Sequence, residues 1–126
     1  MAVTITEAVS DAMCNASVDL VDAGSGAGYI EIYTAAFAVK LAILIMTDPA
    51  FGASSAGVAT ADTIADEDSA LDTGTAATFK MFDSDDTEIL QGSVGTSGED
   101  INLSSVAITT ADVVSITALT ATMPVT

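Results

Sequence analysis

Residues 74–95 of the chain read GTAATFKMFDSDDTEILQGSVG and form its clearest two-strand unit. Two runs that carry apolar residues, Thr78 to Phe82 and Glu88 to Val94, flank the polar turn Asp83-Ser84-Asp85-Asp86-Thr87. Such runs joined by a short turn of Asp, Ser and Thr are typical of a β-hairpin. The sequence therefore predicts a hairpin at this point, and we expect the other strands to be arranged around it.

Further strand-like segments lie on both sides of the hairpin. Short strands separated by turn residues at spacings of about 8–12 residues are typical of sandwiches and barrels. The sequence thus predicts a mainly β fold: an antiparallel β-sandwich or barrel of about eight strands. The run Val39 to Thr47 is apolar at nearly every position, which favours a strand buried on both faces, with a short buried helix as the alternative. The other expected strands are Tyr29 to Thr34, Val58 to Ile64, Ile101 to Leu103, Val106 to Thr109 and Val113 to Thr122.

The N-terminal segment has a helical pattern instead. We expect a helix from about Thr6 to Ala23, begun by the capping box Thr4 to Glu7 and ended by a left-handed glycine within Gly24-Ser25-Gly26. One apolar stripe, which we expect to pack on the rest of the domain, consists of Ile5, Val9, Ala12, Met13, Ala16 and Leu20. A partner-binding helix is the alternative interpretation. The chain is thus expected to be a single domain over 1–126, with the helix in 1–24 and the β-sandwich in 28–126.

Charge is the strongest signal in the composition. The 126 residues include 18 acidic side chains, no Arg and no His, and their only basic side chains are Lys40 and Lys80, so the formal net charge is −16. Binding to nucleic acid depends on Lys and Arg, so we expect no nucleic-acid partner. A strongly acidic surface favours a basic partner surface or a saline medium.

Several other classes of protein are disfavoured by the same composition. Without His or Arg the chain lacks a Ser-His-Asp triad, a phosphate clamp and a zinc site, so we expect no enzyme and no cofactor. The single Cys14 excludes an internal disulfide and is expected to be a small buried residue.

The N-terminus lacks a signal-peptide pattern. The longest apolar run, Ala35 to Met46, contains Lys40 and is shorter than the roughly 20 residues of a membrane span, so we expect no membrane partner.

The hairpin turn is the one place where acidic residues are spaced as in a metal site. Asp83, Asp85 and Thr87 occupy alternate positions, as ligands do in calcium loops. An EF-hand loop, however, needs glycine at its sixth position and a bidentate acid at its twelfth, where this chain has Glu88 and Val94. Because Asp, Ser and Thr are also favoured in turns, we interpret these residues as a turn and keep them only as calcium candidates.

Four residues are candidates for contact with a partner. Pro49 and Phe51 lie in a loop of small residues, and Asp85 and Asp86 lie at the hairpin tip. An aromatic residue in such a loop either plugs the edge of the core or contacts a partner. We therefore expect any interaction to involve the surface of the protein and not a catalytic centre.

Several segments together resemble small structural proteins of tailed bacteriophages. None of them contains a catalytic motif, and the resemblance rests on their order along most of the chain. The segments are AVSDAMCNASVDLVDA (8–23), GSGAGYIEIYT (24–34), TDPAFGASSAGVAT (47–60), DSD (83–85) and GSVGTSGEDINL (92–103).

The resemblance implies a virion component, most naturally a capsid decoration or cement protein of jelly-roll type. Such a protein is made in the cytoplasm of the bacterial host and binds the major capsid protein on the outside of the head, where acidic residues suit basic capsid patches. A homo-oligomer is expected, with a trimer as the natural form at threefold positions. The alternatives are a tail or neck component and a receptor- or carbohydrate-binding β-sandwich, the last of which would expose aromatic residues such as Tyr29 and Tyr33.

Overall fold

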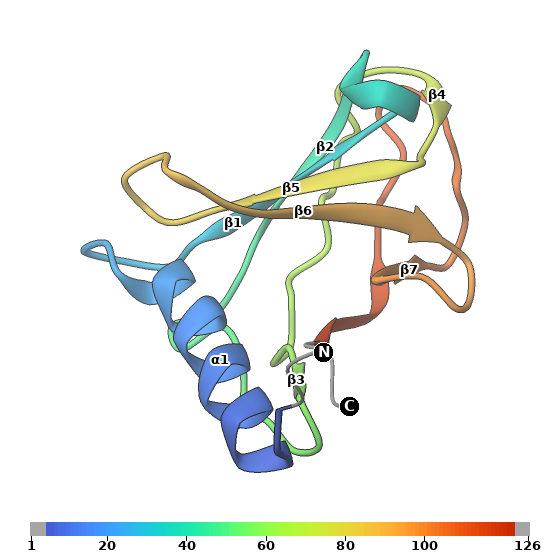
Figure 1. Ribbon diagram of the computed structural model, residues 1–126. Coiled ribbons are helices and arrows are strands. Elements are labelled where there is room, and N and C mark those ends of the chain that lie inside the picture. Colours follow the sequence, from blue (N-terminus) through green and yellow to red (C-terminus); the bar gives the residue numbers. More distant parts are fainter. Residues whose placement is uncertain (1–4, 123–126) are drawn as a thin grey trace.

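A strongly curled sheet with one helix at its open end makes up the computed structural model, which describes residues 5–122 (Figure 1). The seven strands of this sheet follow the order β2-β1-β5-β6-β7-β9-β3, and β4 and β8 form a second, two-stranded sheet. The fold is therefore mainly β and sandwich-like with one N-terminal helix, as the sequence predicts. The helical elements are α1 (Glu7–Asp19) and the one-turn 3₁₀ helices η1 (Leu20–Asp22) and η2 (Ala35–Phe37). The strands are β1 (Tyr29–Tyr33), β2 (Lys40–Ile45), β3 (Val58–Thr60), β4 (Gly74–Thr75), β5 (Thr78–Phe82), β6 (Glu88–Gly95), β7 (Ile101–Leu103), β8 (Ala107–Ile108) and β9 (Ile116–Thr122).

The predicted hairpin is confirmed and lies in the middle of the sheet. Strands β5 and β6 pair antiparallel, with Thr78 opposite Ser93 and Met81 opposite Leu90. Strand β5 also pairs with β1, which places the hairpin between the first and last parts of the chain. Phe79 and Met81 alternate inward and are buried, so this hairpin supplies part of the core.

The expectation of a wholly antiparallel sheet is wrong at one pair of strands. Strands β6 and β7 are parallel, with Val94 opposite Ile101. The short loop 96–100 turns the chain back so that β7 begins beside the end of β6, and Gly98 adopts a left-handed φ of 74° in this loop. The loop is held by the Ser93 hydroxyl, which donates to Glu99 Oε2 at 2.6 Å.

Helix α1 is confirmed, but its predicted buried face is wrong. Val9, Met13 and Leu20 of the apolar stripe are 44%, 45% and 52% exposed. The side chains that are buried instead are Ser10, Cys14, Val18 and, in η1, Val21. The helix packs on β3 and β9, and the Cys14 thiol donates to the carbonyl of Ala121 at 3.3 Å. Small residues face the sheet because they allow the helix to approach β3 and β9 closely. Hydrophobic periodicity alone does not show that the helix packs this closely.

Both ends of the helix differ in detail from the prediction. The N-cap is Thr6, whose hydroxyl accepts a hydrogen bond from the Val9 amide at 3.3 Å, and Thr4 of the predicted capping box lies outside the described residues. The helix does not end in a left-handed glycine, since among the glycines of residues 5–122 only Gly57 and Gly98 have positive φ. Gly24 serves another purpose: a Cβ there would lie 1.8 Å from the Ser84 hydroxyl oxygen, so its absence lets the hairpin turn approach.

Strand β2 lies at an edge of the sheet, and the predicted burial of both its faces is confirmed for only part of its length. Leu41, Ala42 and Leu44 are buried, whereas Ile45 is 54% exposed. The three C-terminal segments predicted as strands each contain one, and β9 has neighbours on both sides. Cys14 is fully buried, as predicted.

Candidate functional site

The hairpin turn is organised by one carboxylate. Asp83 is 7% exposed, and its Oδ1 accepts hydrogen bonds from the amides of Asp85 and Thr87, both at 2.9 Å. The main chain of Asp83 also bonds to Thr87 and Asp86, at 3.0 and 3.2 Å. Asp83 is therefore the internal acceptor of the turn, while Asp85 and Asp86 are exposed.

This arrangement uses the calcium candidates for turn geometry. One oxygen of Asp83 is taken by two amides, and Thr87 takes part through its backbone. Over residues 5–122 no three His, Cys, Asp or Glu side chains lie close enough together to hold a metal ion. The contacts of Asp83, Asp85 and Thr87 thus fit the turn interpretation.

The tip of the hairpin rests on the segment that follows the helix. The Gly26 amide donates to the Ser84 hydroxyl at 3.2 Å, and the Tyr29 hydroxyl donates to Asp86 Oδ1 at 2.6 Å. The ring of Tyr29 stacks on Phe82 with centroids 5.0 Å apart. Burial, and after it the hydrogen bond to Asp86, raise the pKa of Tyr29 above its usual range. These contacts hold the tip against the segment after the helix, and Asp85 and Asp86 remain exposed there.

The second candidate loop is tied to the end of the helix. Asp22 Oδ1 accepts a hydrogen bond from the Ala50 amide at 3.0 Å. Pro49 is exposed and follows a cis peptide bond, so it remains a surface candidate. Phe51 is 7% exposed and belongs to the core cluster, so of its two interpretations the structure supports the core plug and not the surface contact.

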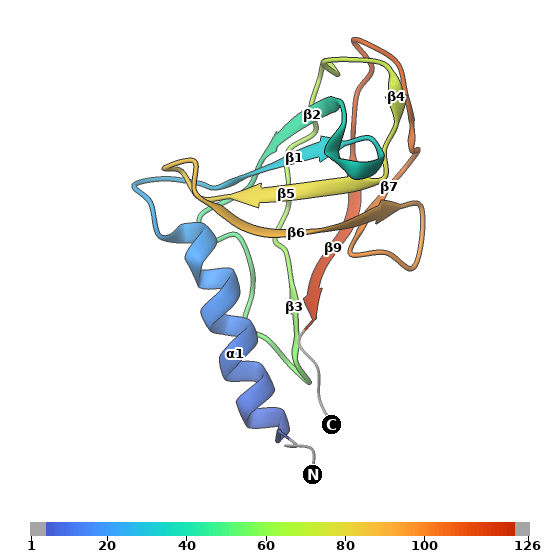
Figure 2. The same ribbon diagram turned by 45° about the horizontal axis from the view of Figure 1, so that its top comes forward.

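The two loops lie at the same end of the molecule, beside the C-terminal end of the helix (Figure 2). We call this region the acidic end and define it by Asp19, Asp22, Asp48, Asp85 and Asp86. Burial, followed by the nearby charges of Asp48 and Asp19, raises the pKa of Asp22, although the hydrogen bond from Ala50 opposes the rise. Five carboxyl groups at one end give a surface suited to binding cationic groups.

Both lysines are engaged within the molecule. Lys40 pairs with Glu31 at 2.5 Å, and Lys80 pairs with Glu88 at 3.4 Å. The Lys80 ammonium also lies 4.9 Å from the centre of the Phe37 ring. These pairs lie on the outer face of β1, β2, β5 and β6, where they neutralise two glutamates and leave the other carboxylates uncompensated.

The tyrosines on this outer face are partly exposed and have partners. The Tyr33 hydroxyl donates to Glu31 at 2.6 Å, and its ring packs edge-on against Phe37 with centroids 5.7 Å apart. Burial, and then the hydrogen bond to Glu31, raise the pKa of Tyr33 to about 12. A carbohydrate that stacked on Tyr29 or Tyr33 would have to share these rings with Phe82 and Phe37.

Sequence reasoning missed a polar clamp on the helix. Asp11 Oδ1 accepts from the Gly57 amide at 2.7 Å, and Asn15 Oδ1 accepts from the Ser54 amide at 2.9 Å. The four-residue spacing of Asp11 and Asn15 places them on one helix side, a signal that a search for apolar stripes passes over. The clamp fixes the loop from Gly52 to Gly57, which contains small residues and has little packing of its own.

Comparison with known proteins gives no relative: no protein family, curated protein or solved structure matches the chain. Among the described residues, no helix has the length and apolar character needed to cross a membrane.

Proposed function

We propose that the chain is a non-enzymatic structural protein of a tailed-phage virion, which decorates the outside of the capsid by binding basic patches of the major capsid protein. The observation that carries this proposal is that all the charge left unpaired within the protein is negative. Both lysines are paired with glutamates, and the net charge is −16. The phage context comes from the sequence resemblance.

The acidic end is the part of the surface that fits docking best. Its two loops are anchored by hydrogen bonds to the segment after the helix and to Asp22, so little conformational freedom is lost when they bind. Complementary charge accelerates the encounter and selects the partner, while burial of neighbouring apolar groups supplies affinity. Exposed Pro49 lies in one of these loops and Leu20 at the end of the helix. Several copies arranged as a trimer would multiply the interaction at a threefold position.

Co-sedimentation with expanded phage heads tests the proposal, and the chain offers a matched control. The variant Asp48→Asn/Asp85→Asn removes two charges from the acidic end, whereas Asp66→Asn/Asp68→Asn removes two exposed charges from another loop. We expect the first variant to bind heads at least about tenfold more weakly, and the second to change binding less than threefold, since rim charges away from the contact contribute little.

Other outcomes would reject the capsid assignment. If the chain ignores heads but binds tail fractions, it is a tail or neck component. If it binds host cells or glycans instead, it is a receptor- or carbohydrate-binding sandwich. Equal losses in the two double variants would show that overall charge, and not the acidic end, determines binding.

A further inference from the structure

The sheet contains a slot beside its shortest central strand. Strand β7 pairs with Val94 and Gly95 of β6 on one side and with β9 on the other. Strands β6 and β9 are therefore about two strand spacings apart there, which is roughly 9.5 Å. Beyond the start of β7, residues 88–93 of β6 and 120–122 of β9 have no strand between them in the part of the chain that the structure describes. The slot is thus one strand wide.

Asp100 closes one end of this slot. Its main-chain carbonyl accepts from the Thr120 amide at 3.1 Å, and its carboxylate accepts from the Ser93 amide at 3.2 Å. Asp100 therefore accepts one backbone hydrogen bond from each of the two flanking strands at the closed end. Since backbone groups on one edge of a strand repeat every second residue, the next groups that face the slot belong to Gln91 on β6 and Thr122 on β9.

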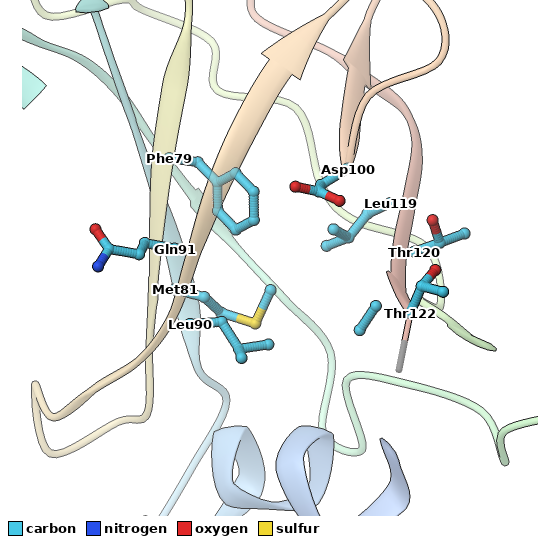
Figure 3. A pocket seen from close by; sticks show the side chains of 9 residues that line it. Phe79, Met81, Leu90, Gln91, Asp100, Leu119, Thr120 and Thr122 are labelled. Carbon is cyan, nitrogen blue, oxygen red and sulfur yellow. The ribbon is translucent and has the colours of Figure 1, made fainter. Parts of the chain in front are cut away.

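A cavity of about 200 Å³ lies in the slot (Figure 3). Its apolar walls are Phe79, Met81, Leu90 and Leu119, and Figure 3 shows the side chains of β5, β6 and β9 converging on it. Except for Leu90, these side chains belong to the buried core, so the cavity opens directly onto the core. It can receive an apolar side chain from a strand laid in the slot.

The rim of the cavity is polar and its charge is negative. Gln91, Asp100, Thr120 and Thr122 line the rim, and neither lysine is among the lining residues. Asp100 and its neighbour Glu99 are exposed. A basic segment complements this rim, whereas a second copy of the chain would bring another net charge of −16 to it.

We propose that the slot accepts an extended, basic segment of a partner protein by strand addition. The segment would bond to the open edges of β6 and β9, place an apolar residue in the cavity and place Lys or Arg beside Asp100. Strand addition itself is independent of the proposed function. The source of the segment, an arm of the capsid protein, rests on that function.

The probe is a capped peptide of alternating lysine and valine, titrated into the ¹⁵N-labelled full chain. We expect the largest amide shifts at Leu90, Gln91 and Thr122, slower exchange of the Gln91 amide, and contacts between a valine methyl group and Phe79. A peptide of alternating lysine and proline has the same charge but lacks half of the backbone donors. It should bind at least about tenfold more weakly. Equal binding of the two peptides, or shifts centred on the acidic end, would overturn the proposal.

Two substitutions test the slot from the protein side. Leu90→Trp fills the cavity and should weaken the peptide at least about tenfold, while the control Ile45→Trp, on the exposed edge of β2, should not. If Leu90→Trp does not fold, Thr122→Pro removes a backbone donor at the end of β9 and should also weaken binding. Peptide affinity unchanged in a folded slot variant, or dimerisation of the chain through this edge, would refute a basic partner strand. If the unmodified chain binds the peptide but not phage heads, only the capsid function is rejected. If it binds heads but not the peptide, only the slot is rejected.

Discussion

The carboxylate of Asp83 gives the sharpest test of whether the hairpin turn is a structural element or a metal site. It is 7% exposed and accepts two amide hydrogen bonds, each 2.9 Å long. A hydrogen bond to a charged group contributes about 1.5–3 kcal/mol, so two represent roughly 3–6 kcal/mol. Because Asp85 and Thr87 are exposed, their amides can bond to water after the substitution. We therefore expect Asp83→Ala to lower the free energy of unfolding by about 2–3 kcal/mol.

Asp83→Asn is the matched control, because it keeps an oxygen acceptor and loses the charge. It should cost about 1 kcal/mol. Urea unfolding measures both values, and for a chain of this size the melting temperature of Asp83→Ala should fall by roughly 6–12 °C. A loss below about 1 kcal/mol for Asp83→Ala would refute the role as turn acceptor. So would a calcium-dependent rise in the melting temperature of the unmodified chain that Asp83→Ala abolishes.

Three further substitutions or reagents test separate parts of the account. The raised pKa of Tyr33 stabilises the fold fully below its unfolded value near 10, and this contribution is lost as the pH rises through about 12, because the unfolded chain ionises first. Tyr33→Phe should therefore flatten the fall in urea midpoint above pH 10, and parallel curves would contradict the burial of this hydroxyl. Gly24→Ala places a Cβ against Ser84 and should cost about 1–3 kcal/mol in urea unfolding; adding Ser84→Gly should recover part of that, and no recovery would refute the close contact. Cys14 is fully buried, and burial raises the pKa of its thiol, so a thiol reagent should react at least about a hundredfold more slowly than in urea-unfolded chain; equal rates would show that helix α1 opens freely.

The sequence predicted those features that depend on local patterns. The hairpin followed from two alternating runs around a polar turn, and the predicted strand Tyr29 to Thr34 contains β1, in which Ile30 and Ile32 are buried. The parallel pairing of β6 and β7 was not predicted, because it depends on the path of a short loop, and strand propensity does not encode direction.

Which face of helix α1 packs against the sheet could not be predicted, for a related reason. Hydrophobic periodicity selects Val9 and Met13, but close packing on β3 and β9 selects the small side chains Ser10 and Cys14. The distance between the packed elements determines which side is buried, and only the tertiary structure contains that distance. As a result, an apolar stripe remains at the surface along the helix, and only Leu20 of it lies near the acidic end.

Of the acidic end, only Asp85 and Asp86 were predicted as contact residues. Tyr29 meets Asp86 across 57 positions of the sequence, and Ala50 meets Asp22 across 28. Spacing along the chain carries no information about such contacts. The sequence did indicate that the relevant surface is acidic, since that follows from composition alone.

Binding to expanded phage heads is the most direct test of the central claim. Heads whose major capsid protein is encoded beside this chain should bind it at low salt, melt at a higher temperature when it is bound, and release it as salt rises and charge is screened. Asp48→Asn/Asp85→Asn should reduce the gain in melting temperature, and Asp66→Asn/Asp68→Asn should preserve it. Heads that neither bind the chain nor gain thermal stability in its presence would contradict the account.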